Sequence, residues 1–456
     1  MIGARPEVLL VAGALVTLVI AATWISGPIR VFLIAQAAHW SICYLARPVV
    51  LLWVRPEPQF GDNIPDPRLA DLGYDVGIAA VLRPVVFGLW LYAGLVVAYV
   101  LWTRLRAPGP RRADLPLARS GQFISTLAVL YVIGTVGRLA AIATGNNSQA
   151  GELESPNPIL NLVAILATVG AIGLIVFARP AGTRNTLLLI GFLMMGELLW
   201  TAAVQSKTPV MGMALALAVR CAVTGWTRIK AAAVVTMAVV AIGGFGWLQS
   251  LKTTPAAKAD ASVIASAYPG IVRPFLSLLS RFDLLEAATD AYYAGPGSWL
   301  TPVQALQHAV ESLIPAQLLG TEKFQSGAAW ATEVRGQSVD MSQVSVSLAE
   351  GNIAEGYVLG GYIGVALGVS VTFALLLIWS RWLYSRSVTL AVLGLAFIEA
   401  PVLYERGMLG AVETLGKYLQ ALVLVWIVAL LVEEYRRRMR PRPLKENAEM
   451  REAQWV

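Results

Sequence analysis

Residues 158–178 read PILNLVAILATVGAIGLIVFA and contain no charged side chain. The hydrocarbon core of a bilayer is about 30 Å thick and an α-helix rises about 1.5 Å per residue, so about 20 apolar residues are enough to cross it. Continuous runs of this length are typical of helices, because the strands of a membrane barrel are about 10 residues long and alternate in polarity. This stretch therefore predicts a transmembrane helix.

The same pattern recurs along the whole chain of 456 residues, which is 57% hydrophobic and only 14% charged. A soluble protein carries roughly 25% charged residues, so this much apolar side chain indicates contact with lipid. About eleven runs are long enough to span a bilayer. They are 8–27, 29–54, 79–103, 122–144, 158–178, 186–204, 209–226, 231–249, 352–379, 388–405 and 417–434. The predicted fold is an all-α, polytopic membrane protein with about eleven transmembrane helices.

Arginine and lysine in the short connections predict the orientation of these helices. The basic connections fall on one side if the helices alternate, and by the positive-inside rule that side is cytoplasmic. They are 104–120, 179–186, 227–230, 380–387 and the tail from Arg436. The N-terminus is then outside. This organisation divides the chain into a transmembrane bundle (1–249), an extracytoplasmic loop (250–351), further transmembrane helices (352–434) and a basic cytoplasmic tail (435–456).

The extracytoplasmic loop at 250–351 is too long to be a simple connection, and long loops are usually functional or disordered. Its aromatic content favours a small packed cap that carries short amphipathic helices. Residues 271–293 predict one amphipathic helix, with Phe275, Leu279 and Phe282 on its apolar face.

Cysteine and histidine are too scarce for a metal centre or a disulfide scaffold. The two cysteines, Cys43 and Cys221, lie in apolar runs, and the two histidines are His39 and His308. The net charge of +7 comes largely from arginines in short connections, which indicates membrane topology and not nucleic-acid binding. The sequence predicts no metal ion and no cofactor.

Four charged residues stand out inside predicted spans, where a charge costs about 2.5–3.5 kcal/mol on insertion scales. Arg138 lies in the outer half of its span and could bind an anionic substrate group or pair with a carboxylate on a neighbouring helix. Arg220 can extend to the cytoplasmic surface, and Arg47 to the outer interface. Glu399 needs a partner, for which Arg138 and Arg47 are candidates.

Arginines of the 250–351 loop are candidates for binding a diphosphate. Arg273 and Arg281 could flank one patch on a helix, and Arg335 follows later in the loop. Guanidinium groups match phosphate oxygens in geometry and charge. The alternative is an interfacial helix whose arginines bind lipid headgroups.

The start of the 352–379 span carries a second set of candidates. Glu355 and Tyr357 lie at its predicted outer mouth, although a carboxylate there is also an ordinary helix cap. Gly360, Gly364 and Gly368 recur every four residues and predict a stripe where another helix approaches closely. Further acidic and basic residues are predicted on the same side, at Glu405, Arg406, Asp62, Asp66, Asp71 and Asp75.

Together these features resemble the oligosaccharide repeat-unit polymerase and O-antigen ligase superfamily, the Wzy type of integral membrane glycosyltransferase. The resemblance covers the helix number, the large loop before the last spans and the basic tail. Three local motifs carry it further: Arg-Phe-Asp at 281–283, Glu-Gly-Tyr with Gly-Gly-x-x-Gly at 355–364, and Glu-Arg-Gly at 405–407.

The resemblance implies metal-independent transfer of polyprenyl-diphosphate-linked oligosaccharide at the outer face of a bacterial cytoplasmic membrane. The partners are then this lipid-linked substrate, membrane lipids and, as a further candidate, a chain-length regulator protein, with no nucleic acid. The diphosphate would meet Arg273, Arg281, Arg138 and Arg406, with Tyr357 and Arg335 also contacting substrate. Candidates for the catalytic base are, in order, Glu355, His308 and Asp66 (or Asp62).

Two other functions remain open from the sequence. A transporter or flippase for a lipid-linked glycan or another amphipathic anion would use the intramembrane charges as a pathway. A glycosyltransferase of the GT-C class would instead place its catalytic aspartate in the first outer loop, at Asp62 or Asp66.

Overall fold

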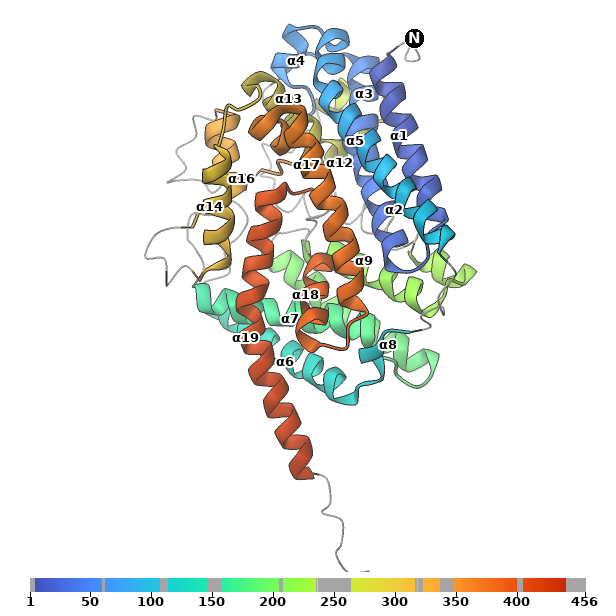
Figure 1. Ribbon diagram of the computed structural model, residues 1–456, viewed down its shortest axis with the longest axis vertical. Helices are drawn as coiled ribbons and strands as arrows, with labels where there is room; N and C mark the ends of the chain where they lie inside the picture. Colours follow the sequence, from blue (N-terminus) through green and yellow to red (C-terminus); the bar gives the residue numbers. More distant parts are fainter. Residues whose placement is uncertain are drawn as a thin grey trace, which may run out of the picture.

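The structure is a computed structural model (Figure 1), and all of its secondary structure in the described residues is helical. It describes residues 5–59, 62–106, 114–145, 157–204, 208–234, 236, 264–315, 318, 323–336, 348–399 and 405–439. The predicted all-α class is confirmed for these ranges.

Eight helices in the described ranges are long and apolar enough to cross a membrane. They are α1 (Pro6–Thr23), Pro28–Val54, α5 (Tyr74–Leu105), α6 (Gly121–Ala143), α7 (Pro158–Phe177), α8 (Thr183–Val204), α17 (Asn352–Leu383) and α19 (Met408–Met439). Two shorter apolar helices are α9 (Thr208–Thr224) and α18 (Val388–Glu399). Almost all of the predicted 231–249 span lies outside the described residues, so the structure supports a polytopic membrane protein without fixing the count at eleven.

The second span changes its helix type midway. It begins as α2 (Pro28–Ser41), passes through a π-helical turn, η2 (Ile42–Ala46), and continues as α3 (Arg47–Val54). Pro48 lacks the N–H that an inner α-helical residue donates, and a wider turn just before it accommodates this loss. The turn brings Arg47 into the protein interior.

The span predicted at 352–379 is not a single straight helix. Gly360 leaves helical geometry (φ −164°, ψ 29°), and Gly361 has a φ of +57°, which favours glycine. Residues 352–359 therefore double back on the rest of α17. A Cβ on Gly364 would overlap the Gly356 carbonyl, and Asn352 donates a 2.9 Å hydrogen bond to Thr372.

The glycine stripe predicted in α17 does permit a close approach, but the approaching helix is the first part of α17 itself. Gly364 packs on Gly356, and Gly368 packs on the backbone of Asn352. Gly360 does not belong to this contact, because it forms the turn.

The prediction of one helix over 271–293 is wrong. The segment forms a 3-10 turn, η4 (Arg273–Phe275), then α12 (Leu276–Arg281), and after a break at Phe282 and Asp283 it forms α13 (Leu284–Ala294). The break lets Leu279 and Phe282 both reach the core while the direction of the chain changes.

Short helices gather at one end of the molecule, as Figure 1 shows for α3, α13 and α4 (Pro67–Asp71) beside the N-terminus. From the opposite end the basic half of α19 extends away. Helix α13 contacts α5 and α17, and α14 (Pro302–Leu313) contacts α19. The short helices of the 250–351 region are thus packed against the spans. Their charged residues lie next to the spanning helices.

Candidate functional site

Two separate clusters of polar side chains lie where these short helices pack against the spans. The α13 cluster comprises Arg47, Asp66, Arg68, Glu286, Asp290 and Arg335. The Glu350 cluster comprises Ser326, Glu350, Glu355, Arg406 and Glu413. Beside the Glu350 cluster, a backbone hydrogen bond of 3.1 Å runs from the Gly351 N–H to the Glu405 carbonyl.

Asp290 is the centre of the α13 cluster and is fully buried. Its Oδ1 lies 2.6 Å from Nη2 of Arg68, and its Oδ2 lies 2.8 Å from Nε of Arg335. The indole N–H of Trp330, the first residue of the π-helical turn η5 (Trp330–Val334), donates to Oδ2 at 3.1 Å. A buried carboxylate is tolerated when cations and donors satisfy it in this way.

Glu286 lies one helical turn before Asp290 and shares Arg335 with it, at 2.9 Å. Arg47 approaches Glu286 at 3.7 Å and donates to the carbonyls of Asn63 and Ile64 at 2.6 and 3.0 Å. Its remaining terminal nitrogen, Nη1, is buried and has no hydrogen-bond partner among the described residues.

The carboxylates of the α13 cluster favour the ionised form of its arginines Arg68 and Arg335. Burial alone would lower the pKa of the Arg68 guanidinium, but the hydrogen bonds to Asp66 and Asp290 raise it above its ordinary value. Burial would also lower the pKa of Arg335, but the negative charges of Asp290 and Glu286 raise it above its ordinary value. For Glu286 burial outweighs the nearby arginines, so the pKa of this carboxyl is raised.

The predicted base Asp66 belongs to this cluster as a structural residue. Its Oδ1 caps α4 by accepting from the Arg68 N–H at 2.8 Å, and its Oδ2 lies 2.7 Å from the Arg68 guanidinium. The alternative base Asp62 accepts from the Tyr268 hydroxyl at 2.8 Å and from the Ile64 N–H at 3.0 Å.

Glu350 is the carboxyl of the Glu350 cluster that has a buried oxygen without a hydrogen-bond partner in the described residues. It is fully buried, and its Oε1 accepts from the Ser326 hydroxyl at 2.8 Å. Within the part of the chain that the structure describes, Oε2 has no partner. Burial raises the pKa of Glu350 above the ordinary carboxyl value, against the opposing effects of Arg406 and the Ser326 hydroxyl.

Arg406 stands beside Glu350 and is only loosely engaged. Its side chain is 32% exposed, and its guanidinium lies 3.7 Å from the Glu413 carboxylate. Glu413 in turn accepts from the N–H of Ser326, at the start of α16 (Ser326–Ala329), at 2.6 Å. A partly exposed cation beside a buried carboxyl is an arrangement that can bind an anion and move a proton in the same place.

Glu355 is fully buried, not open at a mouth, and it is the cap of another helix. Its two carboxylate oxygens accept from the N–H groups of Met408 and Leu409, the first residues of α19. A Cβ on Gly407 would overlap this carboxylate, so the contact needs glycine there. The Glu-Gly-Tyr and Glu-Arg-Gly motifs are therefore in direct contact.

The other predicted residues lie outside the two clusters. Arg273 is exposed and donates to the carbonyls of Tyr268 and Ser266 at 2.9 and 3.3 Å. Arg281 is exposed at the end of α12. His308 lies 3.3 Å from Glu311 and stacks on the ring of Phe324 at 4.0 Å.

Tyr357 is half-buried in the first part of α17 and meets the ring of Tyr362 edge-on, with 5.8 Å between centroids. It packs near Trp330 and the Ala287 face of α13, so it borders the α13 cluster.

The charged residues predicted inside spans find partners of their own. Arg138 forms two hydrogen bonds with Glu197, at 2.6 and 3.0 Å, and a third with Thr168 at 2.6 Å. Arg220 donates to the carbonyls of Ile175 and Ala178 at the end of α7. The Glu399 side chain lies outside the described residues.

Several of these groups carry no distinctive sequence pattern. Glu286 and Asp290 are four residues apart on an amphipathic segment, and this spacing is the one local signal that both face the same side. The pairs Arg68–Asp290 and Arg138–Glu197 have no such signal, because their members are 222 and 59 positions apart in the chain.

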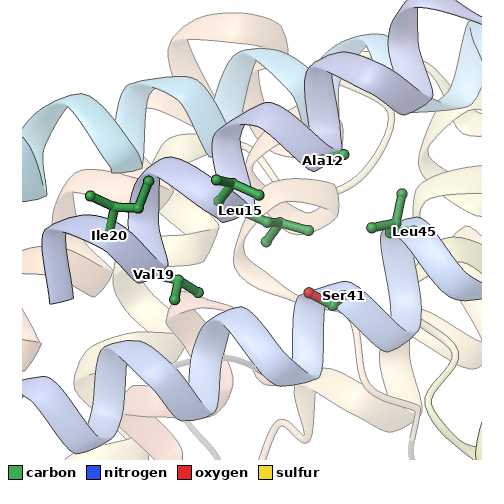
Figure 2. A pocket seen from close by; sticks show the side chains of 7 residues that line it. Ala12, Leu15, Val19, Ile20, Ser41 and Leu45 are labelled. Atoms are coloured by element: carbon green, nitrogen blue, oxygen red, sulfur yellow. The ribbon is translucent and has the colours of Figure 1, made fainter. Parts of the chain in front are cut away.

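An apolar cavity of about 230 Å³ lies between α1 and the α2–η2 helix (Figure 2). Its lining on α1 runs from Ala12 to Ile20, and its lining on the second span is Ser41 and Leu45.

Comparison with protein-family models, with curated proteins and with solved structures gives no match to this chain.

Proposed function

We propose that the chain is a membrane glycosyltransferase that polymerises or transfers polyprenyl-diphosphate-linked oligosaccharide at the outer face of a bacterial cytoplasmic membrane. One observation carries the proposal: Glu350 is buried, has a raised pKa and an unpartnered oxygen, and adjoins the loosely paired guanidinium of Arg406. A raised carboxyl pKa beside a cation is typical of catalytic sites.

In the proposed reaction, Oε2 of Glu350 takes the proton of an acceptor sugar hydroxyl. The hydroxyl oxygen then forms a bond to the anomeric carbon of the donor, and the bond from that carbon to the diphosphate oxygen breaks. Arg406 stabilises the charge that develops on the departing lipid diphosphate. The exposed guanidinium groups of Arg273 and Arg281 supply further positive charge for the incoming donor.

This assignment moves the base from Glu355 to Glu350. Both oxygens of Glu355 already accept backbone N–H groups, so protonation of this carboxyl would uncap α19. Glu350 has an oxygen available without breaking a helix cap.

The cavity between α1 and the α2–η2 helix supports a lipid-linked donor. Its lining is apolar apart from Ser41, whose hydroxyl is hydrogen-bonded to the Ala37 carbonyl at 2.6 Å. A polyprenyl chain there would place its hydrocarbon against apolar side chains of α1 and the second span.

A transporter of an amphipathic anion is the second candidate, because two observations favour it. Arg138 and Glu197 form a buried ion pair between spans, and ionisable groups at such positions often mark transport pathways. The reversal at Gly360 and Gly361 also makes α17 discontinuous, as transporter helices at binding sites are.

The test uses the purified full chain in liposomes with a polyprenyl-diphosphate oligosaccharide, and mass spectrometry of the glycan products. We expect longer or transferred glycan without added divalent metal. Glu350→Gln keeps the acceptor for Ser326 but cannot take a proton, so we expect about a 10²–10⁴-fold loss of rate. Glu333→Gln is the matched control, because Glu333 is exposed and, among the described residues, accepts a hydrogen bond from the Trp299 indole N–H alone.

Three outcomes would overturn the proposal. Full activity of Glu350→Gln would show that Glu350 is not the catalytic base. Movement of the lipid across the bilayer without any new glycosidic bond would favour the transporter. Product that requires an added metal and is lost in Asp66→Ala would favour the GT-C class, with its base in the first outer loop.

A further inference from the structure

Helix α14 presents an unusual apolar stripe to the outside of the molecule. Val303, Leu306, Val310 and Leu313 are 75%, 67%, 51% and 38% exposed. Their spacing of three, four and three residues places them on one face of the helix. In a soluble protein such a face would be turned inward against the core.

The opposite face of α14 packs on α19 through small and polar groups. Ser312 is buried, and a Cβ on Gly416 of α19 would overlap the Ser312 carbonyl, so the two backbones touch. The same carbonyl accepts from the Lys323 ammonium at 3.1 Å. Helix α14 therefore turns the small residue Ser312 toward α19 and leaves its large apolar residues outside.

A third, polar stripe separates the apolar stripe from the packed face. Gln304 completes a capping box with Thr301, and Gln307 donates to Glu311 at 2.7 Å. A helix with adjacent apolar and polar exposed faces is the form that lies at a boundary between hydrocarbon and water.

Exposed apolar residues of α19, next to α14, indicate what covers the apolar stripe. Val423 and Ile427 follow Gly416 by seven and eleven residues, so they share its helical face, and they are 60% and 44% exposed. This part of α19 is a candidate span, so the covering material there is lipid hydrocarbon. The stripe of α14 continues that surface upward along α19, as the two helices run side by side in Figure 1.

We propose that the apolar stripe of α14 is covered by the hydrocarbon chains of membrane lipids, so that this helix of the 250–351 region is embedded in one leaflet. The proposal does not depend on the enzymatic function. It assigns to α14 the role of an interfacial helix whose polar stripe, at Gln307 and Glu311, faces water.

The test places one nitroxide label at a time on the full chain in liposomes, with the buried cysteines Cys43 and Cys221 replaced by alanine. The labelled sites are Val310→Cys, the polar-stripe control Gln307→Cys, and the lipid reference Val423→Cys. Each labelled chain must elute in size-exclusion chromatography as the unlabelled chain does. Collision rates with oxygen, which partitions into lipid, and with a water-soluble nickel chelate are then measured.

We expect the Val310 label to collide frequently with oxygen and rarely with the chelate, as the Val423 label does, and the Gln307 label to show the reverse. A Val310 label that meets the chelate as often as the Gln307 label would overturn the proposal in favour of a face in water. A Val310 label shielded from both reagents would overturn it in favour of a protein partner, including a second copy of the chain.

Discussion

The guanidinium of Arg138 on α6 and the carboxylate of Glu197 on α8 form a bidentate pair, with N–O distances of 2.6 and 3.0 Å, and both side chains are buried. Thr168 of α7 binds the same guanidinium, so three neighbouring helices are joined at one point. Between spans no water solvates either group, so each charge depends on the other. Removal of one partner leaves a buried charge without compensation.

Replacing one partner of this pair should be more harmful than replacing both. Glu197→Met leaves a buried cation without its counter-charge, and we expect a loss of about 3–5 kcal/mol in unfolding free energy. The double variant Arg138→Met, Glu197→Met should recover much of that loss, which thermal unfolding in detergent would measure. Glu434→Met is the control, because its pair with Arg438 is exposed. Additive single effects would contradict the prediction.

The reversal of α17 can be tested at two of its glycines. Gly364→Ala puts a Cβ into the carbonyl of Gly356, so we expect a loss of about 1–3 kcal/mol or more and a lower melting temperature. Gly360→Ala should be nearly neutral, because no atom lies within 4 Å of its Cβ position and its φ of −164° is open to any residue. Equal effects of the two substitutions would argue against the doubled-back arrangement.

The stability of the protein should fall with rising pH through Glu350. The folded state raises the pKa of this carboxyl, so it holds the proton more tightly than the unfolded chain, whose glutamate pKa is about 4.3. The stabilisation is complete below that pH and is lost as the pH rises through the raised value. Melting temperatures measured from about pH 4 to about pH 8 should decline less in Glu350→Gln than in the parent chain. Parallel curves for the two proteins would exclude this linkage.

Asp290 should be the most sensitive acidic residue of the α13 cluster. Asp290→Asn removes the charge that Arg68 and Arg335 share, and we expect a loss of about 3–5 kcal/mol because two guanidinium groups are left under-neutralised. Chemical denaturation in mild detergent would measure the change. Asp71→Asn, at an exposed position of α4, should change the stability little, and a similar loss there would refute the assignment.

The sequence predicts the spans well and their interruptions poorly. The length of an apolar run and its lack of charge are local features of one segment. They therefore predict the positions of α1, α6 and α7 from the sequence alone. The reversal in α17 could not be predicted in this way, because the Gly360–Gly361 pair fits both a packing stripe and a turn. The backbone angles of Gly360 and Gly361 and the contact of Gly356 with Gly364 distinguish the two.

The candidate site was predicted in part for a similar reason. Arg335, Asp66, Glu355 and Arg406 attract notice as charges in an apolar chain. Their partners do not, because Arg68 and Asp290 are 222 positions apart and nothing local relates them. Glu355 shows the limit of residue type as a guide: a carboxylate suited to proton transfer in the sequence proves to be occupied by two backbone donors.

The start of α19 has one mechanical consequence. Its first two N–H groups are held by Glu355, and the carbonyl of Glu405 just before it is held by Gly351. Any sliding or tilting of α19 must therefore drag the folded-back half of α17 along or break three hydrogen bonds at once. The basic segment at the far end of α19 is thus joined, through one rigid helix, to the residues that precede the turn at Gly361.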